Sequence, residues 1–408
     1  MNRILILGQG DPRSYFSVFG NFIFENIPAK ILLFADRKHL PYLKDLPKTV
    51  SIEVVRWSDS QEIIQKAQQE HVKSPFSGIV HWDERTVELA AKLRIILNLP
   101  SHSCENAEIF RDKIMMKNAL GGIPELKIPK FINNATKTGM NSLLDEFGKL
   151  VCKPRKGYGS KGVSIFTSSA DIDKWLAEED SQADFECEEF IEGILYHINA
   201  LVVGGEIRFQ VVAPYLPGFA NIDFSAGTPF VTQLETDAVL VKKLETVSRK
   251  IISKLNILNG VTHLECFVTA GGEIVLCEIA TRPGGGGIVW LIELATGINV
   301  DHAMCLIEAK CEGFIPKSKI QVENETVCLI GMRSSKMGEI QSVPNLSLFS
   351  SLNAPIAKIY LKPGQFLLPS GHCTDFNALF IFKAESALEG LHKLQETRAL
   401  YEKNLVLV

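Results

Sequence analysis

The stretch THLECFVTAGGEIVLCEIATRPGGGG, residues 262 to 287, decides how this chain folds. Two runs in which apolar and polar residues alternate flank the pair Gly271-Gly272. Such a pair suits a two-residue type I′ turn, which needs positive φ at both central positions, so the sequence predicts a β-hairpin here. In the register that follows from this turn, Glu265 lies opposite Glu278.

The predicted hairpin has one charged and one apolar face. Opposed Cβ atoms in a sheet lie roughly 4.5–5.5 Å apart, and two like charges placed there are destabilising unless something neutralises them. Mg²⁺ would do so, because it is usually held by one or two carboxylates together with substrate phosphates. Alternation places His263 on the face of Glu265, and Arg282 on the face of Glu278. The alternative is a surface hairpin with an exposed pair of glutamates.

The other face of the hairpin is apolar, and we expect it to belong to the core. Its members are Leu264, Cys266, Val268, Val275, Cys277 and Ile279.

A glycine-rich stretch, KPRKGYGSKGVSIF at residues 153 to 166, has the spacing G-x-G-x-x-G. A dinucleotide fingerprint requires a helix after the glycines, because the helix N-terminus receives the pyrophosphate. Here the β-branched and aromatic run VSIF follows instead. The sequence therefore predicts strand, glycine turn, strand, with Lys153 before a flap whose N–H groups face an anion. A solvated basic hairpin is the alternative.

A third segment, FECEEFIEG at residues 185 to 193, ends in glycine and does not alternate as an edge strand would. We interpret it as a hinge between two subdomains. Extended segments of this kind bind adenine through backbone N–H and C=O groups.

The length of 408 residues implies two or three packed domains. Up to about residue 102, short apolar runs alternate with helical patterns, which predicts a parallel α/β layer. The turn Gly8-Gln9-Gly10 does not continue as a dinucleotide motif, because Arg13 stands at the third glycine position. A helix is predicted from Glu105 to Leu120, and strands and hairpins follow it. The tail returns to β segments and a long helix.

Composition narrows the function classes. With 46% hydrophobic and 22% charged residues and a net charge of -4, the chain has no basic footprint for nucleic acid. Nine cysteines without a C-x-x-C pair indicate reduced thiols. No run approaches the roughly 18 apolar residues of a membrane span, and the start MNRILILGQG does not read as a signal peptide. We expect a cytoplasmic protein with no nucleic-acid or membrane partner.

Taken together, these motifs resemble the ATP-grasp superfamily. The resemblance rests on Lys113 in FRDKIMMKNAL before GGIP, Lys153 before the glycine loop, EEFIEG, and H-x-E with E-x-x-x-R across the hairpin. The run RPGGGG with WLIELATG behind it is most similar to the L-amino-acid ligase branch.

The resemblance implies an α/β fold, α+β in parts. A Rossmann-like pre-ATP-grasp domain would occupy residues 1–104. The ATP-grasp fold would follow as two α+β subdomains, 105–193 with the glycine loop and 194–310 with the metal hairpin. A β-rich, lid-like piece would occupy residues 311–408.

The resemblance also assigns roles to residues of this chain. The groups that contact ATP phosphates would be Lys113, Lys153, Gly157, Gly159, Ser160 and Gly162. Those around adenine and ribose would be Glu188, Glu189, Phe190, Ile191, Glu192 and His197, with Glu189 and Ile191 acting through their backbone. The metal ligands would be Glu265 and Glu278, for two Mg²⁺ ions, with Mn²⁺ as an alternative. The groups at the second substrate would be His263, Arg282, Gly284, Gly285 and Gly286, and Arg282 and Lys153 would be catalytic.

Two positions depart from the family pattern. Many members carry Asn two residues after the second metal glutamate, where this chain has Ala280, although the amino-acid ligase branch often lacks that Asn. Many also carry Glu near the hinge for the ribose, where this chain has Leu195. Glu192 or His197 could replace that glutamate.

The activity implied is ATP-dependent conversion of a carboxylate to an acyl phosphate, which an amine then attacks to give an amide, ADP and phosphate. The partners would be a small carboxylate and a small amine, most simply two amino acids, and a homodimer is one option. Phe219, Phe224 and Trp290 are candidates for an apolar side-chain pocket. The alternatives are a carboxylase of the biotin-carboxylase type and a catalytically dead ATP-binding regulator.

Overall fold

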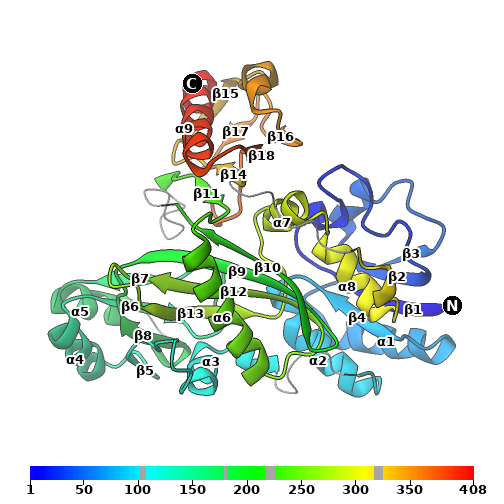
Figure 1. Cartoon of the computed structure of the whole chain (residues 1–408), viewed down its shortest axis with the longest axis horizontal. Helices are drawn as coiled ribbons and strands as arrows, with labels where there is room; N and C mark the ends of the chain where they lie inside the picture. The colour runs from blue at the N-terminus through cyan, green and yellow to red at the C-terminus, as the bar shows by residue number, and fades with distance from the viewer. Residues whose placement is uncertain (101–106, 179–181, 217–225, 317–324) are drawn as a thin grey trace.

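A computed structural model describes residues 1–100, 107–178, 182–216, 226–316 and 325–408 of the chain. Three groups of elements meet around one centre (Figure 1). The N-terminal layer lies on one side, two antiparallel sheets extend away from it, and the C-terminal elements project from the junction.

The N-terminal layer is a parallel sheet of order β3-β2-β1-β4, which confirms the predicted α/β layer. Its strands are β1 (Asn2–Gly8), β2 (Ala29–Ala35), β3 (Val50–Val54) and β4 (Gly78–His81). The helices α1 (Ser60–Lys73) and α2 (Val87–Ile96) pack beside it. Because all four strands run the same way, the segments after β1 and β4 emerge at one edge of the sheet, which faces the other sheets.

The first antiparallel sheet has the order β5-β8-β6-β7. Its strands are β5 (Phe131–Ile132), β6 (Leu150–Pro154), β7 (Ser164–Phe166) and β8 (Phe185–Glu189), and α4 (Lys137–Phe147) and α5 (Ser169–Glu178) pack on it. The glycine-rich loop joins the antiparallel strands β6 and β7. This confirms the predicted order of strand, glycine turn and strand.

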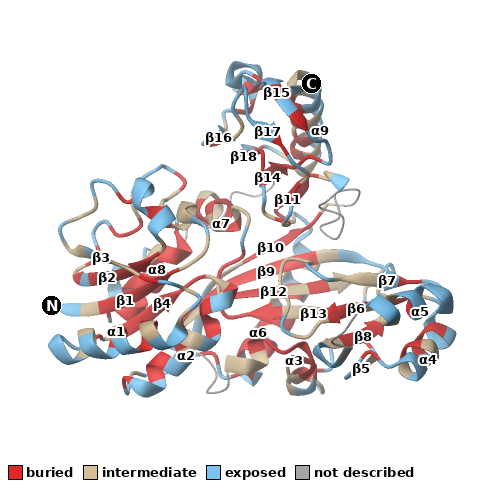
Figure 2. Ribbon diagram, turned by 180° about the vertical axis from the view of Figure 1, so that it is seen from behind, coloured by how far each residue is buried: buried red, intermediate tan, exposed pale blue. Residues whose placement is uncertain are grey.

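The second antiparallel sheet has the order β10-β9-β12-β13. Its strands are β9 (Ile194–Val203), β10 (Glu206–Pro214), β12 (Gly260–Val268) and β13 (Ile274–Ala280), and α6 (Ala238–Lys254) packs against it. Figure 2 shows buried residues concentrated in these strands, while the outer surfaces of α4 and α5 are largely exposed.

The helix predicted from Glu105 to Leu120 is shorter in the structure. A 3-10 turn covers Ala107–Phe110, α3 spans Lys113–Leu120, and Glu105 lies outside the described residues. Asp112 explains the start of α3, because its carboxylate accepts hydrogen bonds from the Ile114 and Met115 N–H groups and so caps the helix. Lys113 is therefore the first residue of α3 and lies at the edge of the central cavity.

The C-terminal sheet has the order β11-β14-β18-β16. Its strands are β11 (Phe230–Gln233), β14 (Thr326–Met332), β16 (Ile356–Ile359) and β18 (Ala378–Ala384), with α9 (Ala387–Asn404) against it. A smaller sheet contains β15 (Gly338–Ser342), β17 (Phe366–Leu367) and β19 (Val406–Leu407). Since β11 comes from the preceding region, the C-terminal sheet draws on both sides of residue 311. The domain boundaries remain predictions.

The helices α7 (Ile288–Thr296) and α8 (Val300–Glu308) pack in the core between the N-terminal layer and the second sheet. Asn299 caps α8, because its side chain accepts hydrogen bonds from the Asp301 and His302 N–H groups. Within the described ranges, no helix is by itself long and apolar enough to cross a membrane. The two helices α7 and α8 reach that length and apolarity only together, and they are bent by 87° relative to each other.

Candidate active site

A cavity of about 860 Å³ lies where these sheets meet, within the size range of ligand pockets. Its walls come from the loops after β1 and β4, the glycine loop, the hinge after β8, the β12–β13 hairpin and residues 372–374. Most of the site residues predicted from the sequence line it; the exceptions are Gly162 and His197.

The predicted pairing of the hairpin is confirmed, since Glu265 pairs with Glu278. The predicted turn is wrong. Thr269 N–H donates to Glu273 O (3.0 Å), and Gly272 N–H donates to Thr269 O (2.9 Å). Of the two glycines, only Gly272 has a positive φ, +76°. The connection is thus a three-residue loop closed by a left-handed residue, and not a type I′ turn.

A second irregularity restores the register. Near the loop Cys266 pairs with Leu276, one residue away from the predicted partner. Between Glu265 and Cys266 the register shifts again, because Cys277 is an extra residue in β13, as in a β-bulge. The bulge turns Cys277 into the cavity, so its assignment to the core face was wrong.

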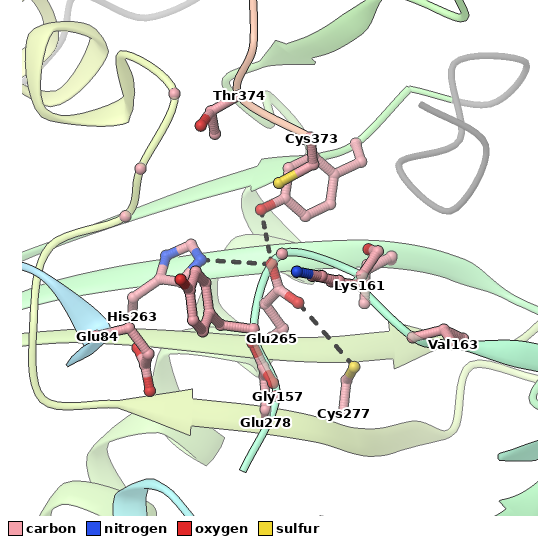
Figure 3. Close-up of a pocket in the computed structure, with 18 of the residues that line it drawn as sticks. Glu84, Gly157, Lys161, Val163, His263, Glu265, Cys277, Glu278, Cys373 and Thr374 are labelled. Carbon is pink, nitrogen blue, oxygen red and sulfur yellow. Dashed lines mark hydrogen bonds and ion pairs between the residues drawn. The ribbon is translucent and has the colours of Figure 1, made fainter. Parts of the chain in front are cut away.

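Glu265 is anchored by neighbours on one carboxylate oxygen (Figure 3). Its Oε1 accepts a hydrogen bond from the Tyr215 hydroxyl (2.6 Å) and lies 3.3 Å from His263 Nε2. Burial raises the pKa of Glu265, but the hydrogen bonds from His263 and Tyr215 outweigh it and hold the pKa below its usual value. Glu265 is therefore an ionised, oriented carboxylate. Its Oε2 lies 4.0 Å from the Cys277 thiol and accepts no other hydrogen bond from the described residues.

Glu278 lies beside the start of α3. Its Oε2 is 3.4 Å from Lys113 Nζ, and the same ammonium donates to the Gly157 carbonyl oxygen (2.9 Å). Among the described residues, no group of three or more His, Cys, Asp or Glu side chains could enclose a metal ion. Two opposed carboxylates with free oxygens nevertheless fit Mg²⁺, which takes its remaining ligands from water and phosphate.

Lys153 belongs to a buried cluster of two lysines and two glutamates. Its ammonium donates to Glu188 Oε1 (2.6 Å), and Lys117 pairs with Glu188 Oε2 (2.5 Å) and with Glu186. Burial lowers the pKa of Lys153, but the charges of Glu188 and Glu186 raise it further, so the net shift is upward. Lys153 therefore stays cationic at the cavity wall, where an anion can share its protons.

Comparison with known proteins agrees with this geometry. Residues 123–296 match the ATP-grasp domain family. The chain contains an ATP-grasp domain. Over 240 residues it is 27% identical to the L-arginine-specific L-amino acid ligase of Bacillus subtilis. That match covers 55% of this chain and 56% of the relative, so it spans little more than half of the relative's length.

Solved structures show the same fold over the whole chain. The L-amino acid ligase of Bacillus licheniformis superposes with a TM-score of 0.74 at 18% identity, covering 100% of this chain and 98% of that one. A biotin carboxylase of Campylobacter jejuni in complex with an ATP analogue superposes with a TM-score of 0.70 at 14% identity, covering 100% and 92%. The predicted resemblance to the ATP-grasp superfamily is confirmed.

Two neighbouring positions of the glycine loop have a left-handed backbone conformation. Gly159 and Ser160 have φ of +62° and +59°. A Cβ on Gly159 would lie 2.7 Å from His372 Nε2 and 3.0 Å from Cys373 Sγ, so the C-terminal segment packs directly on the loop. Gly162 does not line the cavity and packs instead on Pro154.

The hinge lines the cavity with Glu188, Glu189, Phe190, Ile191 and Glu192. The Glu189 N–H donates to Lys130 O (3.0 Å), so this N–H is not available to adenine. The Ile191 N–H forms no hydrogen bond with any described residue, which leaves it open to a ligand.

His197 does not reach the cavity. It is fully buried, and its ring nitrogens are held by the Thr232 hydroxyl (2.8 Å) and the Asn199 amide (2.9 Å). Of the two candidates for the ribose, only Glu192 lines the cavity, together with Leu195.

Arg282 is oriented by a residue that sequence analysis missed. Its Nε donates to Glu84, whose other carboxylate oxygen pairs with Arg111. Arg111 in turn donates to the Lys156 carbonyl oxygen (2.9 Å), at the start of the glycine loop. Glu84 follows β4 at the edge where the parallel strands end, and that position is the signal that could have identified it.

Gly284, Gly285 and Gly286, predicted for the second-substrate pocket, line the cavity. Trp290 does not line it, because its indole N–H donates to Phe16 O (2.7 Å) in the core. Phe219 and Phe224 lie outside the described residues. Tyr215, Cys277, His372, Cys373 and Thr374 also line the cavity, and the last three lie in a segment that carried no motif in the sequence.

Proposed function

We propose that this protein is an ATP- and Mg²⁺-dependent carboxylate–amine ligase. It joins the carboxylate of an amino acid to an amine, most simply a second amino acid, through an acyl phosphate, and releases ADP and phosphate. The cytoplasmic location and the homodimer expected from the sequence belong to this proposal.

The opposed pair Glu265 and Glu278 carries the proposal. It stands in one cavity with the cations Lys113, Lys153 and Arg282. A carboxylate that attacks a γ-phosphate meets strong charge repulsion, and fixed cations offset this repulsion as charge moves toward the leaving group. The cavity is also large enough for a nucleotide and a second small molecule.

In this proposal each residue has a defined task. Glu265 through Oε2 and Glu278 would hold Mg²⁺, which supplies charge neutralisation at the phosphates. Lys113 and Lys153 would bind phosphate oxygens, and the glycine loop would exclude water from them. Arg282, oriented by Glu84, would hold the reacting carboxylate. The Ile191 N–H would bind adenine.

The carboxylase alternative has less support. Ala280 stands where many ATP-grasp enzymes carry an Asn ligand, and the amino-acid ligase branch often lacks that Asn. The relative matched in sequence is an amino acid ligase that is named as specific for L-arginine. L-Arginine is therefore the first carboxylate substrate to test.

The proposal is tested by phosphate release from ATP and Mg²⁺ with pairs of the twenty amino acids, followed by product mass. A pair-dependent release with a mass equal to the two amino acids less water supports it. Release that depends on bicarbonate and not on amino acids would favour the carboxylase. No amino-acid-dependent release would reject the ligase.

A further inference from the structure

Asp301 is a buried carboxyl group in the cavity wall, and its Oδ1 has no hydrogen-bond partner among the described residues. It lies in the first turn of α8, is 1% exposed and lines the cavity. Its backbone N–H donates to Asn299 Oδ1 (3.0 Å), but its own Oδ1 accepts no hydrogen bond within the part of the chain that the structure describes. A buried polar group left in this state costs free energy, so its persistence calls for a ligand.

The surroundings of Asp301 provide no cation. Burial, and next the charge of Glu293 on α7, raise the pKa of Asp301 to about 8, and no basic side chain of the described residues acts against them. Glu293 differs from Asp301 because its Oε2 accepts hydrogen bonds from the Val18 N–H (2.7 Å) and the Asn299 amide (2.8 Å). Glu293 also does not line the cavity.

A second unpartnered group lines the same cavity. Trp82, directly after β4, is 7% exposed, and its indole Nε1 has no hydrogen-bond partner among the described residues. The far end of α8 lies at the other end of β4, where Glu308 accepts from the Ile79 N–H (3.1 Å). Asp301, in the first turn of α8, and Trp82, after β4, line the same cavity.

We propose that Asp301 binds the cationic group of an amino-acid substrate. An ammonium or guanidinium would donate a charge-assisted hydrogen bond to Asp301 Oδ1. Two sources share this chemistry: the α-ammonium of any amino acid, and a basic side chain. That the ligand is an amino acid rests on the proposed function. That the bound group is cationic rests on Asp301 alone.

Binding to the full chain, measured by calorimetry with Mg²⁺ and a non-hydrolysable ATP analogue, tests the assignment without turnover. The probes are two matched pairs, L-arginine with L-citrulline and L-lysine with L-norleucine, in which only the side-chain charge differs. A buffer without amines is needed. The variants are Asp301→Asn and Asp301→Ala, and Glu293→Gln is the matched control at a buried carboxyl outside the cavity.

Charged hydrogen bonds of this kind correspond to a factor of about 10 or more in affinity. If a basic side chain is bound, the wild type prefers the cation of each pair by that factor, and both Asp301 variants lose the preference. If the α-ammonium is bound, both variants weaken all four probes equally. Glu293→Gln keeps the wild-type pattern in either case. Melting temperatures establish that each variant is folded.

Unchanged binding in the Asp301 variants, or no binding of any probe to the wild type, would overturn the assignment. Amino-acid-dependent phosphate release together with unchanged binding would leave the ligase standing and remove only the role of Asp301. Cation-selective binding without phosphate release would support the role of Asp301 and reject the ligase activity.

Discussion

Lys113 Nζ lies 3.4 Å from Glu278 Oε2, so the first residue of α3 is joined to the second carboxylate of the hairpin. The same ammonium holds the Gly157 carbonyl oxygen of the glycine loop. The proposed metal site and the proposed phosphate loop thus share one cation. A phosphate that enters the cavity would compete with Glu278 for Lys113, which would release that carboxylate to the metal.

Glu278→Gln should reduce turnover by a factor of about 100 or more, the usual cost of removing one preorganised electrostatic group. The amide keeps the size of the side chain but cannot neutralise a cation. Amino-acid-dependent phosphate release at several Mg²⁺ concentrations measures this. Glu273→Gln, on the exposed end of the same hairpin, is the control and should behave as the wild type. Wild-type turnover in Glu278→Gln would reject the metal assignment.

Tyr215→Phe should raise the Mg²⁺ concentration needed for half-maximal turnover several-fold. The hydroxyl orients Glu265 by a 2.6 Å hydrogen bond, and a bond to a charged group contributes roughly 1.5–3 kcal/mol. Tyr196→Phe is a matched control, because its hydroxyl binds Glu235 (3.0 Å) and lies outside the cavity. Equal Mg²⁺ dependence in the two variants would show that Tyr215 does not position Glu265.

The Glu265–Glu278 pair was predicted correctly, but the turn and the register from which it was predicted were wrong. The predicted turn and the predicted continuous ladder are both absent, and the loop and the bulge shift the register in opposite directions so that the pair is retained. A bulge depends on what packs on each side of the strand, which the alternation of residues does not encode. The orientation of Cys277 was predicted wrongly for that reason.

Residues of the site that come from distant segments were also missed. Glu84 and Cys373 carry no local motif, and their roles depend on how the N-terminal layer and the C-terminal sheet close around the ATP-grasp domain. By contrast, Lys153 and the glycine loop could be predicted, because strand, turn and strand are neighbours in the sequence. The local sequence pattern identifies the loop. Which distant segments pack on the loop depends on the tertiary structure.

Gly159→Ala should lower turnover strongly at a modest cost in stability. The position has φ of +62°, and the new methyl group would lie 2.7 Å from His372 Nε2, so the loop must move away from the C-terminal segment. Gly204→Ala is the matched control, with φ of +61° and no atom within 4 Å of the added carbon. Both variants should lose about 1 kcal/mol of stability, and only Gly159→Ala should lose activity. Equal activities would show that contact between the loop and the C-terminal segment is not required.

Asp301→Asn should gain stability relative to the wild type as the pH rises. In the folded protein the pKa of Asp301 is about 8, against 3.8 for the ordinary carboxyl, so the folded state keeps a proton that the unfolded state loses. The stabilising contribution of this protonated group is complete below pH 3.8 and is lost as the pH rises through 8. The total loss is on the order of 5 kcal/mol at most, because each pKa unit corresponds to about 1.4 kcal/mol.

The neighbouring titratable groups do not obscure the effect of Asp301 between pH 5 and 9. Burial lowers the pKa of His81, at the end of β4, to about 3, and it raises the pKa of Cys305, on α8, well above its usual value, so both stay neutral between pH 5 and 9. Glu293 shares the upward direction, and Glu293→Gln measures its part separately. The measurement is the melting temperature of wild type and Asp301→Asn at pH 5, 7 and 9 in an amine-free buffer. The difference should move in favour of the variant at each step. A difference in melting temperature that does not change with pH would mean that Asp301 is ionised at all three pH values and already has a cationic partner. That result would contradict the binding role, which is based on a carboxyl oxygen without a partner among the described residues.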